Sequence, residues 1–205
     1  MFAMSTVVRP YKGVSADERR AERRERLLEA LLGVVGAEGV LGVTVDKVCA
    51  DAGLTKRYFY EGFGDLDTLL LAAADALYDR LYARMVEAAT THPEEIDRVR
   101  SVISAVIADL AADPRGARLY VESPAHPGLR ARRDRAVDAF TAFVGTAVLD
   151  LGDAGASDLR IRLIVAGATD VITGFLGGTI DTDQSGVVAA VVDIATALRA
   201  GQAGA

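Results

Sequence analysis

The sequence TVDKVCADAGLTKRYFYEGF, residues 44–63, has the pattern of two short helices joined by a tight turn. Its first helix carries four apolar residues at i, i+3, i+4 and i+7 spacing, namely Val45, Val48, Cys49 and Ala52. Thr44 stands at the N-cap of that helix, and Gly53 follows it at the position that favours a left-handed backbone. Thr55 can cap the second helix, which is basic and aromatic, as expected of a helix that enters the DNA major groove. The stretch therefore predicts a helix–turn–helix motif.

A longer helix is predicted on each side of this motif. Upstream, one apolar helical face ends at Gly39 and consists of Leu27, Leu28, Leu31, Leu32 and Val35. Downstream, Asp65 can cap a helix that begins at Leu66. Over about residues 20–70, the order and spacing resemble the tetracycline-repressor (TetR) family of transcriptional regulators. The positions that carry the resemblance are Arg24, Leu27, Leu28, Ala30, Gly39, Thr44, Val45, Val48, Ala50, Ala52, Gly53, Leu54, Thr55, Phe59, Tyr60, Phe63 and Leu69.

The whole chain is predicted to be all-α, because strictly alternating β-branched runs are scarce while Ala, Leu, Arg and Glu dominate. The resemblance implies an N-terminal three-helix DNA-binding domain and a C-terminal helical domain that binds an effector and dimerises. We expect about nine helices in all, with a flexible basic arm at 1–14, the DNA-binding domain at 15–65 and the second domain at 66–205. The helices expected after the motif are 66–90, 93–112, 114–121, 129–151, 157–178 and 186–199.

Seven residues of the motif are candidates for contacts with DNA: Thr44, Lys47, Thr55, Lys56, Arg57, Tyr58 and Tyr60. The resemblance implies phosphate contacts for the two threonines and Tyr60, and hydroxyl groups at helix starts suit phosphate oxygens. The two adjacent basic residues of the second helix can donate to guanine O6 and N7, while Tyr58 can pack on a thymine methyl. Lys47 projects from the first helix toward the DNA backbone. The alternative for Lys56 and Arg57 is a merely solvated position.

Two positions depart from the family pattern. The family often has His or another polar residue where this chain has Gly62, and it usually has a phosphate-holding Lys where this chain has Leu66. Both changes remove contacts to the DNA backbone.

The net charge of −6 is unusual for a DNA-binding protein, but the charge is unevenly distributed. Residues 1–57 hold ten basic and eight acidic residues, whereas the acidic excess lies in the remainder of the chain. The electrostatic attraction for phosphate is therefore confined to the N-terminal part. Arg9 and Lys12 in the arm can touch phosphate or the minor groove, or they can belong to a solvated tail. The Glu–Arg repeats of residues 18–26 indicate a stabilised polar face close enough for some arginines to contact phosphate.

The middle helices carry scattered aromatic, methionine and histidine side chains. The resemblance implies a small-molecule pocket here, for which the candidate residues are Tyr78, Tyr82, Met85, Tyr120, His126, Phe140 and Phe143. The same residues are also the usual content of a helical core, so both interpretations stay open. The lining candidates favour a small, mostly apolar effector.

The last two predicted helices are apolar on more than one stripe, and four glycines between 167 and 178 allow close helix approach. In the TetR family such a pair joins its mate in a four-helix bundle. The resemblance therefore implies a homodimer that offers two reading heads to a palindromic operator in double-stranded DNA. The alternative is a monomer in which both helices are core. The candidate interface residues are Leu163, Val171, Phe175, Val188, Val191, Val192 and Ala195.

Other kinds of site find little support. The sequence has no Gly-rich phosphate loop, nucleophile elbow or HExxH motif, so neither catalysis nor a cofactor is expected. His92 and His126 lack a neighbouring Cys or second His, which argues against a metal site. Cys49 is the only cysteine and is expected to be packed. Residues 163–180 are apolar, but the central Asp170 disfavours a membrane span, and no signal peptide is evident, so a cytoplasmic protein is expected.

These patterns predict a TetR-like, ligand-responsive homodimeric regulator, a repressor that a small molecule releases from DNA, and not an enzyme. One alternative is a DNA-binding or architectural protein without an effector. The other is an all-α small-molecule enzyme that retains a vestigial DNA-binding head. Salt-dependent binding to a palindrome separates the enzyme from the two regulators, and release by a small molecule separates the regulators from each other.

Overall fold

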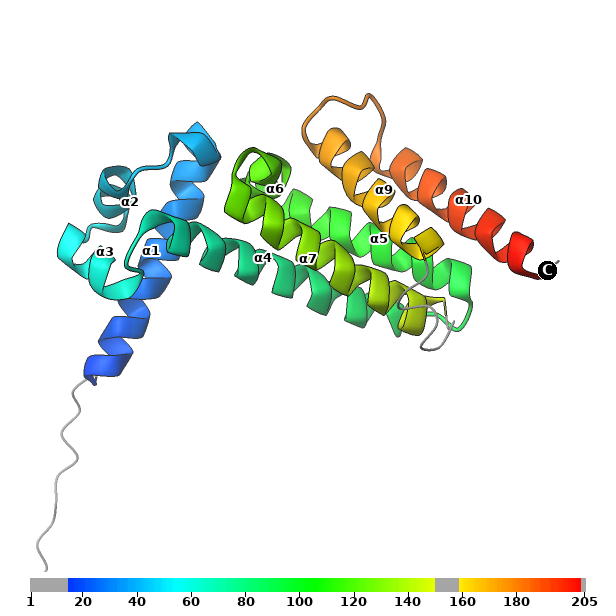
Figure 1. The fold of residues 1–205 in the computed structure, drawn as a ribbon, viewed down its shortest axis with the longest axis horizontal. Helices are drawn as coiled ribbons and strands as arrows, with labels where there is room; N and C mark the ends of the chain where they lie inside the picture. The colour runs from blue at the N-terminus through cyan, green and yellow to red at the C-terminus, as the bar shows by residue number, and fades with distance from the viewer. Residues whose placement is uncertain (1–14, 150–158, 204–205) are drawn as a thin grey trace, which may run out of the picture.

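The computed structural model describes residues 15–149 and 159–203, which form nine α-helices and no strand (Figure 1). The all-α prediction is confirmed. Helices α1–α3, which we call the head, lie at one end of the molecule, and helices α4–α10 form an elongated second unit (Figure 1). The predicted arm at 1–14, the predicted helix end at 150–151 and the predicted helix start at 157–158 lie outside the described residues.

The head begins with α1, Ala16–Glu38, which starts at a paired cap. The Ser15 hydroxyl accepts from the Glu18 backbone N–H at 3.0 Å, and the Glu18 carboxylate accepts from the Ser15 N–H at 2.6 Å. This reciprocal pair satisfies backbone donors that the first turn of a helix leaves free. α1 ends at Glu38 and is followed by Gly39, whose φ of 81° lies in the region that favours glycine.

The predicted helix–turn–helix is confirmed and consists of α2 (Val45–Ala52) and α3 (Lys56–Gly62). The Thr44 hydroxyl accepts from the Lys47 backbone N–H at 3.3 Å, so Thr44 caps α2 as expected. Gly53 adopts the left-handed conformation with φ 61°, and the Leu54 N–H donates to the Cys49 carbonyl at 3.0 Å. This C-terminal motif turns the chain into α3.

A small apolar core holds the three helices of the head together. Leu27 and Leu31 of α1, Val48 of α2 and Phe59 of α3 are all fully buried. Cys49 is also buried, and burial raises the pKa of its thiol. Of the four apolar positions predicted for α2, Val48, Cys49 and Ala52 are buried and Val45 is partly buried.

The second unit starts with α4, Leu66–Ala89, which leaves the head directly after Gly64. The Asp65 carboxylate accepts from the Thr68 N–H at 2.7 Å and caps it. α4 packs against α5 and α7, while α9 and α10 lie side by side and cover α7 and α5 respectively (Figure 1). The remaining helices are α5 (Glu95–Ala112), α6 (Pro114–Glu122), α7 (Pro127–Phe143), α9 (Leu159–Leu176) and α10 (Gln184–Ala203).

Helix ends differ from the predicted bounds where a side chain caps the helix early. α7 begins at Pro127 rather than at 129, because the His126 ring accepts from the Leu129 N–H at 3.4 Å and proline suits the first helical turn. α10 begins at Gln184 rather than at 186, with the Asp183 carboxylate accepting from the Gly186 N–H at 2.8 Å. After Phe143 the chain widens into a π-helical turn, Val144–Val148, which the sequence pattern did not predict.

Within residues 15–149 and 159–203, none of the helices combines the length and the apolar character needed to cross a membrane.

Candidate nucleic-acid interface and ligand cavity

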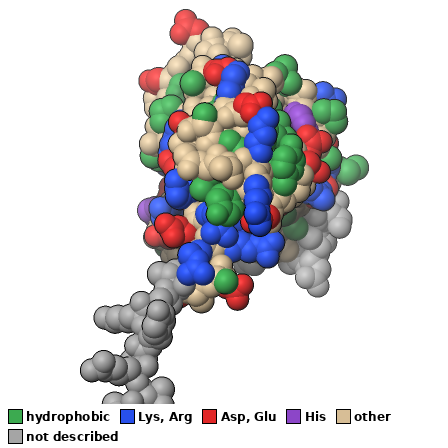
Figure 2. Space-filling model, turned by 90° about the vertical axis from the view of Figure 1, so that its left-hand side faces the viewer, with side chains coloured by type: hydrophobic (Ala, Val, Ile, Leu, Met, Phe, Trp, Pro, Cys, Tyr) green, Lys and Arg blue, Asp and Glu red, His purple; other side chains and the backbone are tan. Residues whose placement is uncertain are grey.

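The head exposes every residue that the sequence nominated for DNA. All seven side chains, on α2, α3 and the caps that precede them, are exposed. Figure 2 faces this end of the molecule and shows lysine and arginine side chains gathered there among fewer acidic ones. The Thr55 side chain makes no capping hydrogen bond to α3, so its hydroxyl is available to an incoming phosphate oxygen.

The three basic candidates of the motif are each paired with a carboxylate of the head. Lys47 pairs with Glu38, and the Lys56 ammonium lies 2.7 Å from the Asp46 carboxylate. Arg57 Nε donates to Glu61 at 2.8 Å across one turn of α3. These hydrogen bonds raise the pKa of Lys56 and lower the pKa of Glu61. Exposed ion pairs of this kind are weak in water, so a phosphate or a base edge can displace the carboxylates.

Arginines of α1 hold helix α3 in place. Arg20 donates to the Glu61 carbonyl at 2.8 Å, and Arg24 donates to the Gly62 carbonyl. Arg23 lies over the Tyr58 ring at 4.6 Å. The Glu–Arg repeats therefore supply more than a solvated polar face, because they fix the C-terminal end of α3 against α1. Spacing along α1 alone could not reveal these contacts, since their partners lie some forty residues away.

A narrow cavity of about 60 Å³ lies inside the second unit, between α4, α5, α6, α7, α9 and α10. Of the seven pocket candidates, Met85, Tyr120 and Phe140 line it. Most of the lining is aliphatic and was not nominated from the sequence, for example Val102 of α5 and Ile172 of α9. Ligand pockets usually measure about 300–1,000 Å³, so a ligand of that size would have to part these helices.

The other four candidates lie around the cavity instead of in its wall. Tyr78 is buried beside it, and the exposed Tyr82 stacks on Phe140 with ring centroids 6.3 Å apart. Phe143 meets Tyr82 edge-on, and His126 caps α7 with its Nε2 3.4 Å from the Asp67 carboxylate. These four residues are thus a surrounding aromatic layer and a helix cap.

The outer face of α9 and α10 bears an apolar groove. Leu163 and Ile194 are 74% and 57% exposed, and Val171 also lines the groove. Phe175 is half-buried. The groove is also lined by Gly167, Ala190 and Ala197.

The nominated residues of α10 are placed differently. They are buried on the side where α10 packs against α5, although Val191 also borders the groove. A second copy would therefore meet chiefly Leu163, Val171 and Ile194, of which Ile194 was not nominated. The buried residues are Val188, Val191, Val192 and Ala195.

Polar contacts join α6 to the end of α1. The Glu122 carboxylate accepts from the Val40 N–H at 2.6 Å and from Arg118 at 2.7 Å, and Arg118 also donates to the Gly36 carbonyl at 3.0 Å. Burial alone would raise the pKa of Glu122, but the bonds from Arg118 and Val40 lower it overall. These contacts connect the head directly to α6, the helix that carries Tyr120 into the cavity wall.

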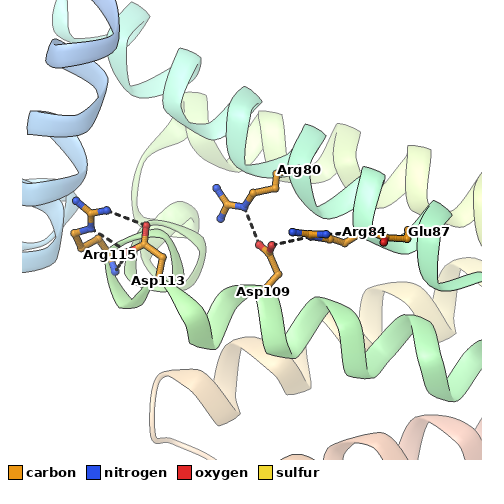
Figure 3. Close-up of polar contacts among 6 residues, drawn as sticks. All are labelled: Arg80, Arg84, Glu87, Asp109, Asp113 and Arg115. Atoms are coloured by element: carbon orange, nitrogen blue, oxygen red, sulfur yellow. Dashed lines mark hydrogen bonds and ion pairs between the residues drawn. The ribbon is translucent and has the colours of Figure 1, made fainter.

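A second polar group ties α4 to α5. Figure 3 shows Asp109 of α5 facing Arg80 and Arg84 of α4, at 2.8 and 3.5 Å. In the same view Arg115 of α6 lies beside α1 and binds Asp113 at 3.0 Å, and Arg115 also pairs with Glu29 of α1. A displacement of α4 would therefore disturb its ion pairs with α5, and a displacement of α6 would disturb its ion pair with α1.

Comparisons with known proteins agree with this architecture. No family model matches the chain. The helix–turn–helix transcriptional activator FasR of Mycolicibacterium smegmatis is 30% identical over 152 residues, which cover 72% of this chain and 68% of FasR. A TetR-like regulator from Rhodococcus sp. RHA1 superposes with a TM-score of 0.64 at 17% identity, over 88% of this chain and 97% of that one. FadR from Bacillus subtilis, solved in complex with stearoyl-CoA, superposes with a TM-score of 0.68 at 18% identity. The superposition covers 83% of this chain and 96% of FadR.

Proposed function

Since the chain belongs to the TetR family of helix–turn–helix transcriptional regulators, we propose that it is a homodimeric repressor released from a palindromic operator by a small, mostly apolar molecule. The observation that carries the proposal is the head, in which every nominated DNA contact is exposed while Phe59 anchors α3 in the core. Residues 15–65 form the DNA-binding domain in this proposal, and residues 66–205 form the effector-binding and dimerisation domain. FasR is named an activator, and an activator would need the same contacts with DNA.

The DNA contacts divide into two kinds. Thr44, Thr55 and Tyr60 bind phosphate and set the position of α3 on the duplex, with Lys47 adding charge toward the backbone. The two basic residues at the start of α3 and Tyr58 face base edges in the major groove. Lys56 and Arg57 exchange their bonds to Asp46 and Glu61 for bonds to DNA as α3 enters the groove.

Alanine at position 56 or 57 is expected to relax base preference, by about 1–3 kcal/mol if the lost contact is bidentate. Thr44→Ala and Tyr60→Phe should instead weaken binding to operator and scrambled duplexes alike, because phosphate contacts carry no sequence information. The measurement is fluorescence anisotropy with both duplexes at one fixed salt concentration. Arg135→Ala, an exposed arginine of α7, is the matched control. If all four head variants bind as the parent does, the DNA-contacting surface has been assigned wrongly.

The groove on α9 and α10 is proposed to bind a second copy of the chain. It is apolar, and side chains as large as Leu163 and Ile194 stand exposed on it. Two copies related by a two-fold axis would bury these side chains against each other. The resulting dimer carries two heads, as two operator half-sites require.

The ligand acts by changing the distance between the two heads. A ligand that enlarges the narrow cavity must displace its walls, which include Leu81 and Met85 of α4 and Tyr120 of α6. Both helices lead to the head, α4 through its start at Leu66 and α6 through Glu122. Operator binding needs half-site spacing of about 34–36 Å or a multiple, so a small displacement of the heads weakens it.

The ligand is expected to lower operator affinity by roughly 5–150-fold, and the operator must lower ligand affinity by the same factor. Both factors are measured by titrating each partner in the absence and presence of the other. Glu122→Gln, which weakens the α6–α1 junction, should reduce both factors while leaving ligand affinity without DNA within about twofold of the parent. Glu87→Gln on α4 is the control. A ligand that binds tightly and leaves operator affinity unchanged contradicts this switch. If a broad screen finds no ligand, the result favours the alternative of a DNA-binding regulator without an effector.

A further inference from the structure

Three hydrogen-bond donors from three helices lie close to one another beside the cavity. Tyr78 of α4 and Tyr120 of α6 are 2% and 3% exposed, and their ring centroids lie 6.2 Å apart. Tyr120 lines the cavity, as does Phe140, on which Tyr78 also packs. The guanidinium of Arg133 on α7 is close enough to act electrostatically on both tyrosine hydroxyls.

Two of these donors are buried without a partner. Across the residues that the structure describes, only the Tyr78 hydroxyl and Arg133 Nε are buried side-chain polar atoms that lack a hydrogen bond. Ser123 lies near the Tyr78 hydroxyl but outside hydrogen-bond geometry, and it donates to the Leu119 carbonyl at 2.6 Å. Folded proteins pair the great majority of such groups, so each exception calls for an explanation.

The neighbouring arginine shows that α7 does not lack acidic partners in general. Arg132, next in the chain, binds Asp75 and lies 3.6 Å from the Asp79 carboxylate. It also lies over the Tyr78 ring, with its guanidinium carbon 5.2 Å from the centroid. Arg133 therefore differs from its neighbour in having a buried Nε donor without a partner.

The protonation of the three groups makes them all donors. Burial raises the pKa of Tyr78 and of Tyr120, so both hydroxyls keep their protons at neutral pH. A guanidinium stays charged at any pH at which the protein is folded. Three donors, one of them cationic, match an anionic acceptor.

The rest of the cavity wall selects an apolar body. Apart from Tyr120 its only polar lining residue is Thr169, whose hydroxyl already donates to the Val165 carbonyl at 2.8 Å. The remainder is aliphatic or aromatic, with valines of α5 and of the π-helical turn prominent. A multiply charged head group would be costly to bury here, which favours a monoanion over a phosphate dianion.

We propose that the effector is an apolar carboxylate, and that Arg133, Tyr78 and Tyr120 bind its carboxylate group while its apolar part occupies the enlarged cavity. This inference rests on the proposed function, because it names the chemical class of the effector that releases the protein from DNA. It assigns a role to Arg133, which no sequence motif singled out.

The test compares matched acids and alcohols on the full-length protein without DNA. Octanoate and 1-octanol form one pair, and 3-phenylpropionate and 3-phenylpropanol form a second pair of different shape. Isothermal titration calorimetry should show at least one acid binding at least about tenfold more tightly than its alcohol. Arg133→Met should abolish that preference and leave alcohol affinity within about twofold of the parent. Arg135→Met, on the same helix and exposed, should behave as the parent.

Tyr78→Phe provides a second variant that removes one hydroxyl and keeps the ring. It should lower acid affinity several-fold without changing alcohol affinity, and it tests the site even if Arg133→Met does not fold. The proposal is overturned if neither acid binds, if the alcohols bind as tightly as the acids, or if acid binding survives in every foldable variant.

The result is separable from that of the proposed function. If an acid binds through Arg133 but operator affinity is unchanged, the carboxylate site is supported and the proposed release from DNA is refuted. If a different class of molecule releases the operator and no acid binds, the proposed release from DNA is supported and the carboxylate site is refuted.

Discussion

Replacing Leu163 and Ile194 together by aspartate is expected to separate the dimer into monomers and to lower operator affinity by at least about 1,000-fold. Both side chains are exposed on the protomer and line the groove of α9 and α10, so the change leaves the protomer core intact. In a two-fold interface each aspartate is introduced twice, and burying these unpaired charges is costly. A monomer offers one head to a two-half-site operator, so its binding should fall toward the non-specific level.

Sedimentation velocity at micromolar concentration and anisotropy with the operator measure the two effects. Val86→Asp, on a half-exposed site of α4 outside the groove, is the control and should stay dimeric. Phe175→Asp is a less clean test, because Phe175 is half-buried and packs against the protomer's own core. A double variant that stays dimeric, or a monomeric parent with full operator affinity, would refute the assigned interface.

Phe59→Ala is expected to destabilise the head by about 3–5 kcal/mol and to abolish specific DNA binding. The ring is 0% exposed and meets the Tyr60 ring edge-on at 5.3 Å, so its removal leaves a cavity beneath α3. Because the same helix presents the residues that face DNA, loosening its anchor should cost affinity even where those residues are unchanged.

Chemical denaturation followed by circular dichroism measures the free energy of unfolding, and anisotropy measures DNA binding. Tyr60→Phe is the control for stability, since it removes only an exposed hydroxyl and should leave unfolding nearly unchanged. Phe59→Leu should fall between the parent and the alanine variant. An alanine variant as stable as the parent would show that α3 is not anchored through this ring.

The head could be predicted from the sequence because its signals are local. Thr44, Gly53 and Asp65 act on backbone groups within four residues of themselves, and the structure shows each of them in the predicted place. The spacing that predicted Val48 and Ala52 on the apolar face of α2 likewise depends only on helix geometry.

The cavity was harder to predict because it depends on how separate helices meet. Val102 and Ile172 have the same spacing whether their helix faces a cavity or a solid core, so no local pattern marks them as lining residues. His126 appeared as a pocket candidate from its chemistry, but its ring is used to cap α7. Arg133 gave no signal at all, since what distinguishes it is a buried donor that only the packed structure reveals.

The helix α10 illustrates the same limit. It is apolar on more than one side, so the sequence could not decide which stripe faces α5 and which faces outward. In the structure Val188 and Val192 are buried, while Ile194 is exposed and lines the outer groove together with Leu163 of α9. The paired charges of the head escaped prediction for a related reason, because Lys56 and Asp46 lie on different helices and meet only across the turn.

The central claim is that two heads on one dimer read a palindrome in DNA. The most direct test is selection of bound duplexes from a random DNA library by the purified protein, followed by sequencing. The account predicts enrichment of an inverted repeat whose half-sites lie about one helical turn, 10–10.5 base pairs, or a multiple of it apart. Enrichment of no sequence, or of a single half-site without its inverted partner, would contradict it.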